Sequence, residues 1–87
     1  MHTAYVLINS DLGTDESIIS KIKEILKDEK DVKFTTQGVY GIYDIILKLS
    51  SDNTDILRNI ITYKIRKINK VQSTLTMMVV EAPEKSD

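Results

Sequence analysis

The sequence lacks the residues that most catalytic and metal sites use. It contains no cysteine, and His2 is the single histidine among 87 residues. A disulfide framework, a thiol nucleophile, a thiolate metal site and a histidine cluster are therefore excluded. These absences favour a binding protein over an enzyme, so we expect no catalytic residue, no cofactor and no metal site.

Long apolar runs are absent too. Hydrophobic residues make up 41% of the chain, but their clusters, such as residues 77–80, fall far short of the ~20 apolar residues of a membrane span. No basic region precedes an apolar run at the N-terminus, as it would in a secretory signal. We therefore expect a cytoplasmic protein without membrane contact. Its length allows one core, so we expect a single domain over residues 1–81 and a disordered polar tail over residues 82–87.

The hydrophobic pattern predicts strands and helices in alternation. Thr14 offers a hydroxyl cap to the first helix, and the capping cluster at residues 51–54 opens the second helix. The strands are expected at residues 4–9, 32–37, 42–49 and 71–80, and the helices at residues 15–28 and from residue 54 to about residue 68. The order β-α-β-β-α-β predicts a ferredoxin-like α+β fold, with a four-stranded antiparallel sheet and both helices on one face.

The net charge of -1 hides an uneven distribution. Residues 56–80 contain five basic and no acidic side chains, whereas residues 1–55 contain six basic and ten acidic ones. The basic residues could contact phosphates, but cations near a helix C-terminus are the favoured explanation. By helical angle Lys64 lies inside the apolar stripe of the second helix. We expect it to snorkel past the core edge, and a contact across a subunit interface is the alternative.

Side-chain alternation divides each strand between two faces of the sheet. The more apolar sets, expected under the helices, are Tyr43, Ile45, Leu47 and Leu49 of the third strand and Val71, Ser73, Leu75, Met77 and Val79 of the fourth. The opposite face is expected to carry Ile42, Ile46, Met78 and Val80, with either Tyr5 and Leu7 or Val6 and Ile8 from the first strand. Such a patch usually marks an interface, and a symmetric dimer is its commonest form.

The glycine-containing turn at residues 38–44 is the strongest candidate for a binding site. Its two glycines free backbone N–H groups to hold a carboxylate, and Asp44 could pair with an ammonium. A free amino acid has both groups. The alternative is that the glycines serve only the turn and that Asp44 caps a strand end. No base lies beside the hydroxyls of the fourth strand, and Asp52 and Asp55 are explained as helix-capping residues rather than metal ligands.

Three stretches resemble the C-terminal effector-binding domain, or RAM domain, of the Lrp/AsnC (feast/famine) transcriptional regulators. They are Ala4-Tyr5-Val6-Leu7-Ile8-Asn9, Gly41-Ile42-Tyr43-Asp44-Ile45-Ile46, and Ile65-Arg66-Lys67-Ile68 leading into Val71-Gln72-Ser73-Thr74-Leu75-Thr76. The resemblance implies a ferredoxin-like domain that dimerises through its sheet and forms rings of dimers, an octamer or a decamer. It also implies a small effector, usually an amino acid, bound between dimers by Gly41, Tyr43, Asp44, Ser73, Thr74 and Thr76.

Full-length members of that family carry a helix-turn-helix domain ahead of this one, and the first strand here begins near residue 4. The chain is therefore similar to the stand-alone form, for which no direct DNA binding is expected. The leading hypothesis is an amino-acid sensor in transcriptional regulation. The alternative is a purely structural oligomerisation module that co-assembles with full-length regulators, and a small enzyme similar to the cofactor-free monooxygenases is the least supported.

Overall fold

The computed structural model describes residues 1–80, and it confirms the ferredoxin-like fold. The expected tail, residues 82–87, lies outside the described residues. The elements follow in the predicted order β-α-β-β-α-β. They are β1 (His2–Ser10), α1 (Asp15–Leu26), β2 (Val32–Gly38), β3 (Ile45–Ser51), α2 (Thr54–Ile60) with its continuation η1 (Ile61–Ile65), and β4 (Val71–Met78).

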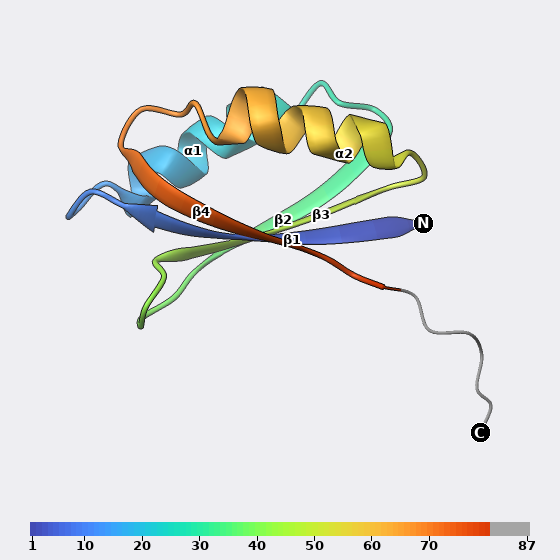
Figure 1. The fold of residues 1–87 in the computed structure, drawn as a ribbon. Coiled ribbons are helices and arrows are strands. Elements are labelled where there is room, and N and C mark those ends of the chain that lie inside the picture. The colour runs from blue at the N-terminus through green and yellow to red at the C-terminus, as the bar shows by residue number, and fades with distance from the viewer. Residues whose placement is uncertain (81–87) are drawn as a thin grey trace.

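The sheet is antiparallel with the strand order β2-β3-β1-β4, so β1 is central and β4 forms one edge. Figure 1 shows α1 and α2 side by side over one face of the twisted sheet, with the other face open. The core fills the space between the two layers. It consists of Ala4, Val6, Ile8, Ile18, Ile22, Leu26, Val32, Ile45, Leu47, Leu49, Leu57, Ile60, Ile61, Ile65 and Ile68.

The first helix begins as expected but without the expected cap. Thr14 occupies the N-cap position, yet its hydroxyl forms no capping hydrogen bond to the helix. Instead it donates to the carbonyl of Asp11 at 2.7 Å, which fixes the turn that leads out of β1. In α2 the capping prediction is confirmed, because Asn53 Oδ1 accepts from the backbone N–H of Asp55 at 2.8 Å.

A π-helical turn, η1, continues α2 and explains the position of Lys64. The backbone N–H of Arg66 donates to the carbonyl of Ile61 at 3.1 Å, five residues back. The wider turn rotates the chain less per residue than an α-helix does, so Ile61 and Ile65 stay in the core while Lys64 turns out of it. Lys64 Nζ lies 2.6 Å from Glu29 Oε2. This agrees with the expectation that Lys64 snorkels past the core edge, because its side chain is 46% exposed and its ammonium group reaches a carboxylate at the surface.

The side-chain alternation predicted for β3 is confirmed, although the strand begins at Ile45 rather than Ile42. Ile45, Leu47 and Leu49 are buried under the helices, and Ile46 is half-buried on the open face. Ile42 lies in the loop before the strand and is 85% exposed. It therefore does not belong to the sheet face to which we assigned it.

The alternation predicted for β4 is wrong because of a β-bulge. Asn9 pairs with Ser73 but Ser10 pairs with Val71, so Gln72 is an extra residue on β4. An extra residue reverses the alternation on one side of it. Val71 therefore contacts the core as expected, whereas Ser73, Leu75 and Met77 face away from the helices. The helix side carries Thr74, Thr76 and Met78, opposite the buried residues Ile8, Val6 and Ala4 of β1.

The open sheet face is consequently more apolar than the sequence indicated. A row of three branched aliphatic side chains, Ile46, Leu7 and Leu75, crosses β3, β1 and β4, and Tyr5 pairs with Met77 beside it. Leu75 and Met77 are each 46% exposed. We name these five residues, Tyr5, Leu7, Ile46, Leu75 and Met77, the apolar sheet face. Met78, which we expected here, faces the helices, and Val80 lies beyond β4.

The alternation along β3 predicts the effect of truncating neighbouring side chains. We expect Leu47→Ala to lower the free energy of unfolding by about 3 kcal/mol, because it leaves a cavity in the core. Lys48→Ala, one residue away on the exposed side, should change it by less than about 0.5 kcal/mol. Urea denaturation at equal protein concentration measures both. Similar losses for the two variants would contradict the register described here.

Candidate functional site

The loop between β2 and β3, residues 39–44, is closed by a hydrogen bond and exposes its tip. The backbone N–H of Val39 donates to the carbonyl of Asp44 at 2.9 Å. Gly41 has a φ of 140°, a conformation that favours glycine, whereas Gly38 has no positive φ. Tyr40 and Ile42 beside Gly41 are almost fully exposed, and Tyr43 is half-buried. The loop thus presents backbone and two large apolar side chains outward.

Asp44 fastens this loop to the end of β1. Its Oδ2 accepts a hydrogen bond from the backbone N–H of Ser10 at 2.9 Å and one from the Ser10 hydroxyl at 3.3 Å. Its own backbone N–H donates to the carbonyl of Ile8 at 2.9 Å. These contacts agree with the interpretation that Asp44 caps a strand end. The other carboxylate oxygen, Oδ1, accepts no hydrogen bond from residues 1–80, and it remains available to a further donor.

Strand alternation places the three hydroxyl residues of β4 on two faces of the sheet, and the bulge determines which of them face the helices. Ser73 lies on the open side, where its Oγ accepts a hydrogen bond from Asn9 Nδ2 at 3.2 Å. Thr74 and Thr76 lie on the helix side, at the sheet edge beyond the centre of the core. Within one chain, Gly41, Tyr43 and Asp44 therefore lie together in one loop. Thr74 and Thr76 lie together in one groove. Ser73, the sixth candidate, lies on the other side of the sheet from these two threonines.

The groove between α2–η1 and β4 is the second component of the candidate site. Its volume is about 450 Å³, and it is lined by Arg58, Ile61, Thr62, Arg66, Thr74, Thr76 and Met78. No residue of loop 39–44 lines this groove, because β4 is the edge strand and β1 lies between it and β3. We refer to this hollow as the arginine groove.

The two arginines are functional candidates that we did not assign to the site from the sequence. Arg58, Thr62 and Arg66 recur at four-residue intervals, the one signal that could have placed them on a common face. The remaining basic residues of this region, Lys64, Lys67 and Lys70, do not line the arginine groove. Lys64 pairs with Glu29, and Lys67 Nζ lies 5.8 Å from the ring centroid of Tyr63.

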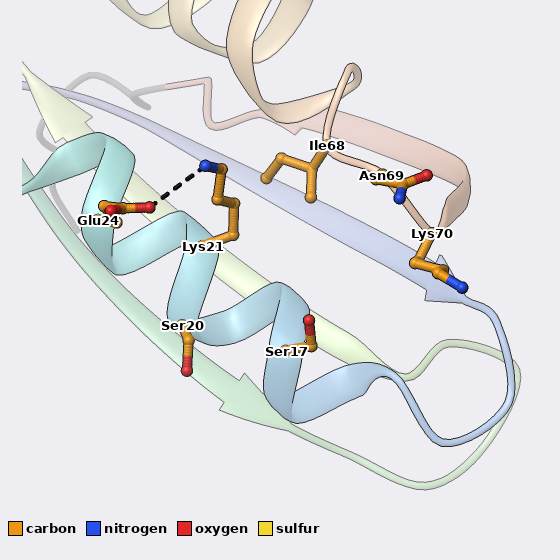
Figure 2. A pocket seen from close by; sticks show the side chains of 7 residues that line it. All are labelled: Ser17, Ser20, Lys21, Glu24, Ile68, Asn69 and Lys70. Carbon is orange, nitrogen blue, oxygen red and sulfur yellow. Dashed lines mark hydrogen bonds and ion pairs between the residues drawn. The ribbon is translucent and has the colours of Figure 1, made fainter.

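Another groove, of about 530 Å³, lies between α1 and the segment that precedes β4. Figure 2 shows that its polar side chains do not converge on one point and that Lys21 instead points toward Glu24. Lys21 Nζ lies 3.2 Å from Glu24 Oε1, so these two charges offset each other. This groove offers no arrangement comparable to the two arginines and three threonines of the arginine groove.

Within residues 1–80, no group of three or more His, Cys, Asp and Glu side chains is arranged to hold a metal ion. No helix in this part of the chain is long and apolar enough to cross a membrane. The two components carry groups that can form hydrogen bonds and ion pairs with a ligand. The loop presents backbone groups and a carboxylate oxygen, and the groove presents guanidinium and hydroxyl donors.

Comparison with known proteins agrees with this architecture. No protein-family model and no curated protein matches the sequence. Among solved structures, FFRP-DM1 is 35% identical, with a TM-score of 0.74 over 92% of this chain and 100% of its own. PHS023 from Pyrococcus horikoshii is 34% identical, with a TM-score of 0.72 over 94% of this chain and 93% of its own.

More distant neighbours are longer transcriptional regulators. AsnC of E. coli is 24% identical, with a TM-score of 0.71, and 99% of this chain covers 55% of AsnC. A transcriptional regulator from Neisseria meningitidis, NMB0573, solved as a complex with L-Met, is 10% identical, with a TM-score of 0.67; 98% of this chain covers 53% of it. At these identities the likeness concerns the fold alone.

AsnC and NMB0573 are regulatory proteins, and their likeness to this chain concerns the fold alone. The resemblance to FFRP-DM1 extends over 92% of this chain and over the whole of that one. The chain therefore belongs to the same protein family as FFRP-DM1, and its fold is that of the Lrp/AsnC-type regulators.

Proposed function

We propose that the chain is a stand-alone amino-acid-binding and oligomerisation domain that acts in transcriptional regulation. The observation that carries this proposal is the separation of the two components of the site. Loop 39–44 and the arginine groove each face outward, and neither encloses a ligand by itself. A second copy of the chain that brought its loop against the groove would complete a closed site.

Dimerisation through the apolar sheet face is the first step of this assembly. The face has five large apolar residues on three adjacent strands, and polar residues such as Asn9 and Lys48 surround them. An apolar centre within a polar rim is the usual composition of a protein interface. A single patch that packs against itself gives a twofold dimer. The helices cover the opposite face of the sheet, so the dimer leaves both grooves accessible.

The second step joins dimers into a ring of four or five, with the ligand between them. Tyr40 and Ile42 expose large apolar surfaces at the loop tip, which suits contact with a neighbouring copy. In such a contact, the backbone N–H groups near Gly41 would hold the carboxylate of an amino acid. Asp44 Oδ1 would accept from its ammonium group, while Tyr43 would line the loop side. Thr74 and Thr76 would lie across from them, and Ser73, which lines a hollow at the sheet edge with Thr74 and Arg66, would contribute from there.

The comparisons support a regulatory role with a small effector. The Neisseria meningitidis regulator of this fold was solved with L-Met, which makes an amino acid a reasonable ligand class here. The match to FFRP-DM1 covers that whole chain, which supports a domain acting by itself or by mixing with full-length Lrp/AsnC regulators. A role in transcriptional regulation supports a cytoplasmic location.

One observation favours a second candidate function, an oligomerisation module that co-assembles with full-length regulators without an effector. The Asp44 carboxylate already accepts two hydrogen bonds from Ser10 of the same chain, so a structural role alone can account for it. A ligand screen separates the two candidates, because only the first one predicts binding.

The dimer proposal is tested with Leu75→Glu, which places a carboxylate at the centre of the apolar sheet face. Burial of an unpaired charge costs several kcal/mol, so we expect the dimer to dissociate into monomers at micromolar concentration. Asn59→Glu, on the exposed surface of α2, is the matched control and should leave the dimer intact. Size-exclusion chromatography with light scattering measures the masses. A wild-type chain that is monomeric in this experiment would refute the interface.

The effector proposal is tested by a thermal-shift screen of the twenty amino acids. At 100 times its Kd, a ligand adds about 2.7 kcal/mol to stability, which corresponds to a rise of several degrees in Tm. We expect at least one amino acid to produce this rise in the wild type and none to do so in Asp44→Ala.

Ser10→Ala is the control for the Asp44 variant. It removes the hydroxyl contact to Asp44 but keeps the carboxylate and the backbone hydrogen bond, so the ligand-induced rise should persist. Without ligand, Asp44→Ala should melt lower than Ser10→Ala, because it leaves the N–H of Ser10 without its acceptor. A wild-type protein that no amino acid stabilises would favour the structural module instead.

A further inference from the structure

The arginine groove contains two positive side chains and no negative one. Arg58 and Arg66 lie on its α2–η1 wall, and none of its lining residues is acidic. Neither arginine forms an ion pair with a carboxylate in the described part of the chain. Lys64 on the same helical segment does have such a partner, Glu29. The positive charge of the groove is therefore not offset by the residues that surround it.

The π turn contributes to this arrangement. In a regular α-helix, a residue eight positions further along lies about 80° around the axis, since each residue turns the chain by roughly 100°. The wider turn at Ile61–Ile65 reduces this offset. Arg58, Thr62 and Arg66 consequently line one groove beside β4. Two guanidinium groups on one face favour the binding of an anion.

The rest of the groove restricts the size and type of that anion. Thr62, Thr74 and Thr76 contribute hydroxyl groups, which donate hydrogen bonds to a carboxylate. Ile61 and Met78 contribute apolar surface. A guanidinium group binds a carboxylate through two parallel hydrogen bonds. The lining therefore fits a short aliphatic chain that ends in a carboxylate better than it fits a bulky or cationic group.

We infer that the effector is an acidic amino acid, of the aspartate or glutamate type. This inference rests on the proposed function: loop 39–44 of one copy would hold the α-amino and α-carboxylate groups, and the ligand side chain would enter the arginine groove of another. A neutral side chain would leave the two guanidinium groups without a counter-charge. A lysine or arginine ligand would add a third positive charge to the groove, which electrostatic repulsion disfavours.

Isothermal titration calorimetry of the wild-type protein tests the inference with L-Asp against L-Asn and L-Glu against L-Gln. Each pair differs little in size but differs in side-chain charge. We expect the acidic member of at least one pair to bind about tenfold tighter than its amide or more, which corresponds to one charge-assisted hydrogen bond or more. L-Lys should not bind.

Arg58→Gln and Arg66→Gln should each weaken the binding of the acidic amino acid by about tenfold or more. Lys67→Gln is the matched control, since it removes one positive charge from the same helical segment but lies outside the groove lining. It should bind as the wild type does. Circular dichroism melts establish that the variants fold. If a glutamine variant does not fold, the corresponding lysine variant, which keeps the charge but loses the paired donors, should still bind more weakly.

The failures of the two proposals are distinguishable. If a neutral or basic amino acid binds tighter than aspartate and glutamate, or if the arginine variants bind them unchanged, the inference is wrong and the proposed function stands. If no amino acid binds, the proposed function itself fails. Inorganic phosphate and duplex DNA are included as further titrants. If either binds tighter than the acidic amino acids, and loses affinity in Arg66→Gln, the groove is a phosphate site and the inference is overturned.

Discussion

The pairing of β4 with β1 is the constraint on which the other surfaces of this molecule depend. A single extra residue, Gln72, sits between two registers of the same strand pair. Its amide donates to Asp11 Oδ1 at 2.6 Å, and the N–H of Asp11 donates to the carbonyl of Lys70 at 3.0 Å. These contacts hold the bulge against the turn that follows β1. Without the extra residue, each side chain from Ser73 onward would face the other side of the sheet.

Two surfaces of opposite character result from this one irregularity. On the open side, Leu75 and Met77 extend the apolar row that Ile46 and Leu7 begin. On the helix side, Thr74 and Thr76 face α2–η1 near the sheet edge, where threonine hydroxyls remain accessible to a ligand. The sequence of β4 is thus suited to two contacts at once, an apolar one through the sheet and a polar one through the groove.

Local periodicity predicted most of the fold. The order of the elements, the antiparallel sheet and the buried set of β3 all follow from patterns that extend over only a few residues. The sequence did not predict the two places where a strand or a helix departs from its regular periodicity. The bulge at Gln72 reversed the alternation of β4, and the π turn at Ile61–Ile65 moved Lys64 out of the apolar stripe that a regular helix would give. Such departures depend on tertiary contacts, which a single strand or helix does not encode.

The candidate site was predictable only where its residues are close together in the sequence or lie in the stretches that carry the resemblance. Gly41 and Asp44 are close in sequence, so their loop could be recognised, and the hydroxyls of β4 were found through the resemblance. Arg58 and Arg66 were attributed to the helix dipole, because only the π turn and the position of β4 bring them to one groove. The hydrogen bonds of Asp44 to Ser10 join residues 34 positions apart, a contact that no local pattern contains.

The position of the two site components gives the proposed mechanism a physical basis. A ligand that contacts loop 39–44 of one copy and the arginine groove of another binds only where two copies meet. Ligand binding and assembly are then linked, and each must strengthen the other by the same free energy. A ligand with a negative side chain would increase this coupling free energy. Its charge would offset the positive charge that the arginine groove of one copy presents to the neighbouring copy. In such an assembly the concentration of the effector determines the population of the ring, so the domain would report on the supply of an amino acid.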